Sequence, residues 1–268
     1  MVHFLARNNI DIDNLLSHEV PTYWDQAKVV ARNPCIVAEF FHMYVNAFKS
    51  AILGYDPKQR SVTPGILGVT RGYYGCVEAQ GRGSLHCHMV VWIHGGMTSD
   101  QIRERATADM VWRDRLIEFL DDTVCNVIPA DPDPSMKVQS SEHHPCAVCG
   151  LNMNADPGAE DTLKALLKDL RNVILESQCH SHTRMCYKYS SSGNKTCCFN
   201  LDENNVMPFT SFDEEVGSVV MRHLDGMVNN YNPSIALATR CNGDIKFMMS
   251  GDAAKSVLFY ITDYITKS

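Results

Sequence analysis

The stretch GYYGCVEAQGRGSLHCHMVVWI, residues 72–93, decides the fold. Two runs rich in aromatic and β-branched residues, 72–79 and 85–93, flank the glycine-containing segment QGRGS, a pattern typical of a β-hairpin. Alternate side chains of a strand share a face, so His86 and His88 project to the same side. Their Cα atoms lie about 7 Å apart at a rise of ~3.3 Å per residue. The sequence therefore predicts a hairpin whose two imidazoles can converge on one metal ion.

The strand that precedes the histidines offers a third ligand. Glu78 and Gln80 are two residues apart and share a face of that strand, and either could complete the set. Two imidazoles and one oxygen leave coordination positions open, as a catalytic divalent ion requires. An isolated HxH motif, however, is more often two polar residues on a solvated strand face. The rest of the chain must decide between these interpretations.

Helical and extended patterns alternate outward from this hairpin. We expect a second strand pair around 236–249, and helices over 33–54, 98–120, 161–177, 214–228 and from about Asp252 onward. Hairpins interleaved with helices favour an α+β fold, with a central antiparallel sheet covered by helices. No GxxxxGK[ST] stretch is present, so the sequence contains no P-loop motor.

The overall composition limits the classes of protein. The 268 residues suit one large domain, and no apolar run approaches the length of a membrane span. Eleven cysteines behind a start without a secretory pattern predict an intracellular protein that holds zinc rather than disulfides. The net charge of −7 disfavours a general nucleic-acid coat protein but leaves room for a local basic groove.

The last segment, YITDYITKS, places Tyr260 and Tyr264 on one helical face, with Lys267 three residues beyond the second. Aromatic residues at this spacing usually pack into a core. A phenol can also attack phosphorus when a metal polarises the phosphoryl group and a cation stabilises the phenolate.

A Cys/His-rich stretch lies between residues 143 and 200. A CxxC pair followed by a His/Cys group indicates a structural zinc site, because four such ligands can close a tetrahedron. The alternative is a set of unrelated buried thiols. The candidate ligands are Cys146, Cys149, His180, His182, Cys186 and Cys197.

These motifs, in this order, resemble one family. The chain from about Arg32 to Ser268 is similar to the Rep nuclease domain of Helitron rolling-circle transposases, which are HUH endonucleases with two tyrosines and carry a Helitron helicase-like domain. The segments that carry the likeness are NPCIVAEFFHMYVNAF, YYGCVEAQGRGSLHCHMVVWIHGG, YNPSIALATRCNGDIKFM and YITDYITKS. The resemblance implies a truncated segment over 1–31 and a nuclease domain over 32–268, with a zinc-binding insertion at about 143–200.

The resemblance also implies roles for individual residues. His86 and His88 match the HUH metal ligands, with Glu78 or Gln80 as the third, and Lys267 matches a trailing lysine. Tyr260 and Tyr264 match the nucleophiles that cut single-stranded DNA at transposon ends, with Mg²⁺ or Mn²⁺ on the scissile phosphate and a 5′-phosphotyrosine intermediate. Arg71 and Arg82, beside the hairpin, are candidates for phosphate contacts, although an exposed arginine is by default a solvated residue.

The chain departs from the family pattern at several points. The zinc pattern HxHTxxC…CRF fits His182, Cys186, Cys197 and Phe199, but Cys198 replaces the arginine. From the resemblance we expect an opening strand motif before this sequence and a helicase domain after it, so that the sequence represents a truncated form of the full-length family protein. Loss of that strand would weaken the sheet that holds the hairpin.

Three hypotheses follow. The first is an intracellular, nuclear DNA nickase and strand transferase. The second is an inactive transposon-derived fragment that binds single-stranded DNA or a partner. The third is an unrelated metal hydrolase that uses His86 and His88 with a water molecule.

Overall fold

The computed structural model describes residues 28, 30–58, 63–79, 84–135, 160–188, 196–198, 201–249, 259 and 261–263. The chain divides into two compact units, and each is described by itself below. Unit 1 comprises Met1–Gly96 together with Ser256–Ser268, and unit 2 comprises Met97–Lys255.

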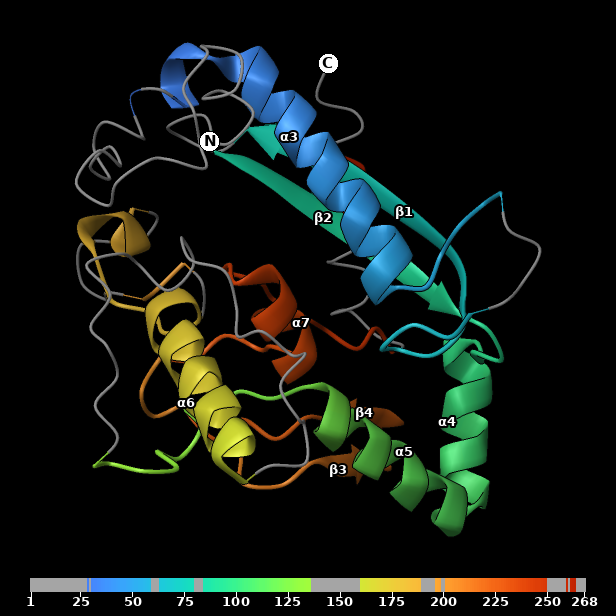
Figure 1. Ribbon diagram of the computed structural model, residues 1–268. Coiled ribbons are helices and arrows are strands. Elements are labelled where there is room, and N and C mark those ends of the chain that lie inside the picture. The colour runs from blue at the N-terminus through green and yellow to red at the C-terminus, as the bar shows by residue number, and fades with distance from the viewer. Residues whose placement is uncertain are drawn as a thin grey trace. The chain divides into compact units, whose positions relative to one another are not determined.

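Unit 1 begins with the predicted helix. Helix α3 spans Pro34–Ala47 and continues into the π-helical turn η2, Phe48–Ile52 (Figure 1). Proline at the first helical position has the backbone angle that a helix start requires and lacks only an N–H that would have no helical partner. Gly54, at φ +62°, ends the segment in a left-handed conformation that favours glycine. The helix predicted over 33–54 is confirmed.

The predicted hairpin is also confirmed. Strands β1, Thr70–Ala79, and β2, Leu85–Ile93, pair antiparallel with Tyr73 opposite Val91 and Glu78 opposite His86. Lys49 of η2 donates a hydrogen bond from Nζ to the Tyr73 hydroxyl over 3.0 Å. The α3–η2 segment thus covers the hairpin face that carries Tyr73, and strand alternation turns Glu78 and His86 to the opposite face.

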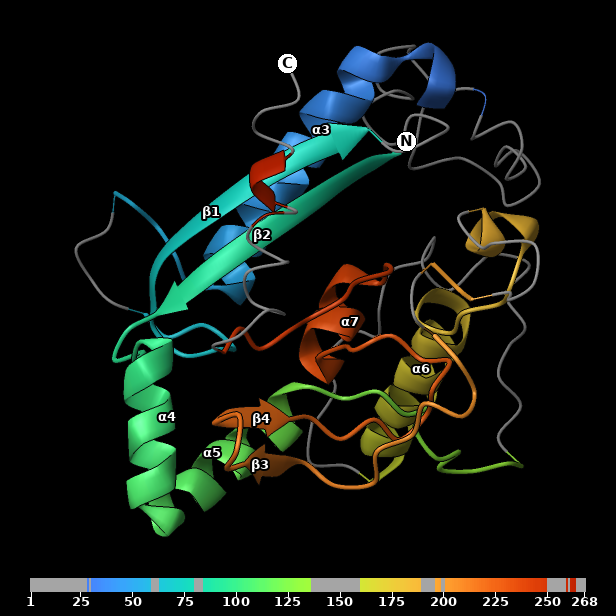
Figure 2. The ribbon, with the colours of Figure 1, turned by 180° about the vertical axis from the view of Figure 1, so that it is seen from behind.

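Near its C-terminal end the chain returns to unit 1. Phe259 and Ile261–Asp263 are helical, and the side chain of Ile261 is buried. These residues, in red, lie on the side of the hairpin away from α3 (Figures 1 and 2). The remainder of the helix predicted from Asp252 lies outside the described residues.

In unit 2 the helix predicted over 98–120 is instead two helices. Helix α4 spans Ser99–Ala108, and helix α5 spans Met110–Thr123. Asp109 has extended backbone angles, and its carboxylate accepts the Trp112 N–H over 3.0 Å, which caps α5. The apolar spacing continues across the break, so periodicity alone could not reveal this N-cap.

Helix α6, Glu160–Ser177, confirms the helix predicted over 161–177 and carries the core of unit 2. One apolar face of α6 packs against the chain around Val228 and against helix α7, Pro233–Thr239. The buried members of this core are Leu170, Val173, Ile174, Val228, Tyr231 and Ala236.

Two other expectations for unit 2 are wrong. The predicted helix 214–228 is replaced by the pair β3, Ser211–Asp213, and β4, Ser218–Val220, which turns at Gly217 with φ +66°. The strand pair predicted around 236–249 is replaced in its first part by α7. The side chain of Asn232, the N-cap of α7, accepts a hydrogen bond from the Ile235 N–H and donates one to the Thr123 carbonyl. The contact with Thr123 is tertiary, so the local sequence pattern could not predict it.

The fold class is α+β with antiparallel strand pairing, as predicted. Among the described residues the strands form two separate two-stranded sheets, β1–β2 and β3–β4, rather than the one central sheet predicted. No helix in the described part of the chain is both long and apolar enough to cross a membrane.

Candidate metal centres

The hairpin face, defined as Cys76, Glu78, His86 and His88, presents side chains that strand register alone brings together. Glu78 lies opposite His86, and Cys76 lies opposite His88. The Nε2 atom of His88 is 3.1 Å from Oε1 of Glu78, and the two imidazole rings are 4.6 Å apart between centroids. The two imidazoles and the carboxylate therefore share one face of the hairpin, as predicted, and Glu78 contacts His88.

Partial burial shapes the electrostatics of this face. Burial lowers the pKa of His86, the neighbouring His88 lowers it further, and Glu78 partly opposes both. Burial and the nearby Glu78 raise the pKa of Cys76. Both shifts favour neutral side chains, and a neutral imidazole is the form that binds a metal ion.

Several predicted residues of this site lie outside the described residues. Arg71 is described and is exposed on β1. Cys76 was not singled out from the sequence, although its position two residues before Glu78 on the same strand placed it on this face. The predicted residues outside the described part are Gln80, Arg82, Tyr260, Tyr264 and Lys267.

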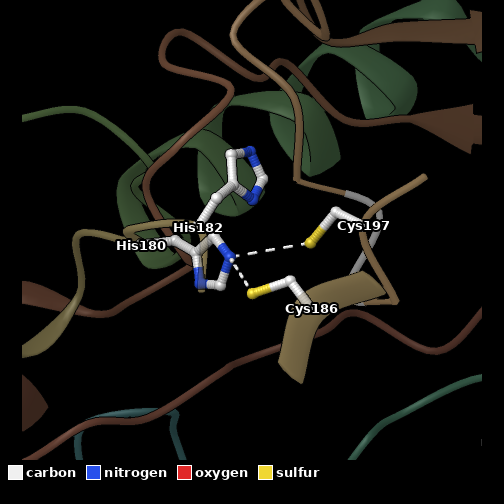
Figure 3. Close-up of side chains that lie close together, drawn as sticks. All are labelled: His180, His182, Cys186 and Cys197. Atoms are coloured by element: carbon white, nitrogen blue, oxygen red, sulfur yellow. Dashed lines mark hydrogen bonds between the residues drawn. The ribbon is translucent and has the colours of Figure 1, made fainter. Parts of the chain in front are cut away.

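The second constellation is the Cys/His cluster, defined as His180, His182, Cys186 and Cys197 (Figure 3). One potential ligand atom from each residue lies within 4.8 Å of the others. Among the described residues this is the one group of three or more His, Cys, Asp or Glu side chains that meets this distance. Four of the six predicted zinc candidates therefore meet, whereas Cys146 and Cys149 lie outside the described residues.

Backbone contacts with the core of unit 2 position this cluster. Cys179, just beyond the end of α6, forms a β-bridge with buried Val228. His180 then donates its N–H to the Met227 carbonyl over 2.8 Å. The first ligand is thus held against a packed core rather than carried on an unattached loop.

Local hydrogen bonds lower the pKa of Cys186. Cys186 lies in the short 3₁₀ turn η4, Arg184–Tyr187, and Thr183 directly precedes this turn. The backbone N–H of Thr183 donates a hydrogen bond to Cys186 Sγ over 3.2 Å. This N–H, with further help from the Thr183 hydroxyl and His182, lowers the pKa of Cys186 to about 7 against the opposing effect of burial. The role of Thr183 was not anticipated, although the HTxxC spacing contained the signal.

A comparison with known protein families finds a match for part of the chain. Residues 7–91 match the family described as the Helitron helicase-like domain at the N-terminus. No curated protein and no solved structure matches the chain. Residues 7–91 are therefore similar to the Helitron helicase-like domain, in agreement with the resemblance drawn from the motifs. The matched segment contains α3, β1 and most of β2, and hence the whole hairpin face.

Proposed function

We propose that this protein is a metal-dependent endonuclease that nicks single-stranded DNA and transfers strands at the ends of a rolling-circle, Helitron-type transposon, in the nucleus. The observation that carries the proposal is the hairpin face, where Glu78, His86 and His88 lie side by side within a segment similar to the Helitron helicase-like domain.

The hairpin face fits a catalytic Mg²⁺ or Mn²⁺. Two imidazoles and a carboxylate oxygen lie on one face of the hairpin, and as three ligands they would leave coordination positions of the ion for substrate oxygens. Such an ion, when bound, polarises a phosphoryl oxygen. Glu78 lies within hydrogen-bond distance of His88, so it either orients that ring or serves as the third ligand. Gln80 is the competing third ligand.

The proposed nucleophiles are Tyr260 and Tyr264. The phenolate oxygen of one tyrosine attacks phosphorus, the bond to the 3′-oxygen breaks, and a 5′-phosphotyrosine and a free 3′-hydroxyl result. Because the phosphotyrosine keeps the ester energy, a hydroxyl can reverse the attack and join strands. Lys267 stabilises the phenolate, and Arg71 and Arg82 contact phosphates on either side. The helical residues 259 and 261–263, on the hairpin side away from α3, support this assignment.

The Cys/His cluster has no part in this chemistry. Its soft ligands suit zinc in a structural role. In the full-length family protein a helicase domain would supply strand separation.

A covalent-adduct assay tests the proposal. The full chain is incubated with end-labelled single-stranded DNA from a transposon end and Mn²⁺, and products are separated on a denaturing gel. We expect a protein–DNA adduct that disappears in Tyr260→Phe/Tyr264→Phe and persists in the control Tyr55→Phe, whose ring packs on Tyr73.

The other outcomes contradict the proposal in distinguishable ways. An adduct that persists in the double variant excludes these tyrosines as nucleophiles. Cleavage without an adduct indicates a hydrolase that uses water. DNA binding without cleavage indicates an inactive transposon-derived fragment.

A further inference from the structure

We propose that His180, His182, Cys186 and Cys197 form a closed zinc site that is complete without Cys146 and Cys149. The bound ion fastens the segment around Cys197 to the turn that follows α6. This inference rests on the geometry of unit 2 alone and does not depend on the DNA chemistry proposed for unit 1.

The observed distances match a tetrahedral ion. Zinc binds thiolate sulfur at about 2.3 Å and imidazole nitrogen at about 2.0–2.1 Å, so a sulfur and a nitrogen in one tetrahedron lie about 3.6 Å apart. The Nε2 atom of His180 is 3.4 Å from Cys186 Sγ and 3.6 Å from Cys197 Sγ (Figure 3). These nitrogen–sulfur separations match the distance expected between two ligand atoms of one tetrahedral zinc ion.

A hydrogen-bond explanation accounts for this arrangement less well. One imidazole nitrogen carries either one proton or one lone pair, and it cannot make two good hydrogen bonds to two sulfurs at once. Both sulfurs nevertheless approach the same Nε2 atom, and both cysteines are buried. A shared cation between the three atoms satisfies all of them.

Among the described residues, the apolar packing around the cluster is small. The local core consists of Cys186, Cys197 and Leu201, with Tyr187 packed against it. One backbone bond, from the Cys198 N–H to the Cys186 carbonyl over 2.8 Å, brings the second cysteine beside the first. Loop-rich segments of this kind gain their stability from metal binding.

The donor set selects the ion and its role. Two thiolates and two imidazoles prefer zinc over Mg²⁺ or Mn²⁺, which favour oxygen ligands. Four protein ligands leave no position for water or substrate, so the site is structural. The Thr183 N–H donates to Cys186 Sγ and so fixes the position of that sulfur beside His180.

Alkylation of the wild-type chain tests the ligand set. The zinc-loaded chain and a chelated sample are treated with iodoacetamide, and modified cysteines are mapped by mass spectrometry alongside a zinc count. We expect one zinc at this site, with Cys186 and Cys197 protected until chelation. Exposed Cys198 serves as the internal control and reacts in both samples. Equal reaction of Cys186 and Cys197 in both samples, or no bound zinc, overturns the proposal.

Cobalt substitution tests whether the CxxC pair contributes. Cys146→Ser/Cys149→Ser should retain, for each cobalt bound at this site, the same thiolate-to-cobalt absorption as the wild type. Cys197→Ser should lose about half of that absorption or all of the metal, whereas the neighbouring control Cys198→Ser should be unchanged. Loss of the absorption in Cys146→Ser/Cys149→Ser would assign the site to the CxxC pair instead.

Discussion

The hairpin face and the Cys/His cluster both gather histidines, yet they are built in opposite ways. On the hairpin face, the register of two strands places His86, His88 and Glu78 together, and the backbone ladder holds them without an ion. In the cluster, His180 is bonded to the core of unit 2, but Cys186 and Cys197 lie on a short turn and a separate segment, with little apolar packing among the described residues. Side chains that two paired strands hold in position can leave metal coordination sites free for a substrate. Ligands on loops are held in position by the metal ion itself.

Zinc removal should produce the largest difference between the two regions. Structural zinc contributes roughly 10–16 kcal/mol of apparent binding free energy in small zinc-binding peptides. Chelation should therefore raise amide exchange over 180–188 and leave the amides of β1 and β2 protected, as measured by hydrogen exchange with mass spectrometry. Added zinc should restore protection, and added magnesium should not. An equal loss of amide protection in both regions would show that the zinc ion does not stabilise the cluster locally.

Loss of a hairpin imidazole should affect chemistry and leave the fold intact. His88→Ala should reduce adduct formation about 10²–10⁴-fold, because metal-assisted charge stabilisation contributes several kcal/mol. The thermal unfolding temperature should change little. The matched control is His94→Ala, which alters an exposed histidine just beyond β2. An equal effect of both substitutions on adduct formation would remove His88 from the site.

A mutation at the contact between α6 and α7 should lower the stability of unit 2 whether or not zinc is bound. Arg240 at the end of α7 is buried and pairs through both guanidinium NH groups with Asp169 of α6, at 2.6 and 2.9 Å. Asp169→Ala removes this bidentate partner of a buried cation and should lower the free energy of unfolding by roughly 3–5 kcal/mol in urea titrations.

A control on the same helix separates this effect from a general loss of negative charge. Asp161→Ala, in the exposed first turn of α6, should cost only about 0.3–1 kcal/mol. If the Asp169→Ala effect vanished after chelation, α6 would depend on the metal for its position.

The smallest effect concerns acid stability. The Lys168 ammonium, hydrogen-bonded to Asp131, lowers the pKa of that carboxyl. The contribution is present above the unfolded-state value of about 3.9 and is lost as the pH falls through the folded-state value. Urea midpoints measured from pH 7 to pH 3 should therefore fall less steeply at the acid end for Asp131→Asn than for the wild type. An unchanged slope would show that the Asp131–Lys168 ion pair does not contribute.

Prediction from the sequence succeeded where the signal was local and periodic. The amphipathic helices 33–54 and 161–177 and the hairpin around QGRGS required only spacing and turn residues. It failed where a tertiary contact overrode the pattern. Gly217 permits the turn between β3 and β4, and Asn232 begins α7 by bonding to both Ile235 and the distant Thr123.

The sequence by itself determined the hairpin, the common face of Glu78, His86 and His88, and the Helitron resemblance, because strand alternation and motif order are properties of the chain. Only the tertiary structure showed that His180, His182, Cys186 and Cys197 come together; Cys146 and Cys149 lie outside the described residues. That arrangement depends on the β-bridge from Cys179 to Val228 and on the backbone hydrogen bond from the Cys198 N–H to the Cys186 carbonyl, which join segments that no local pattern connects.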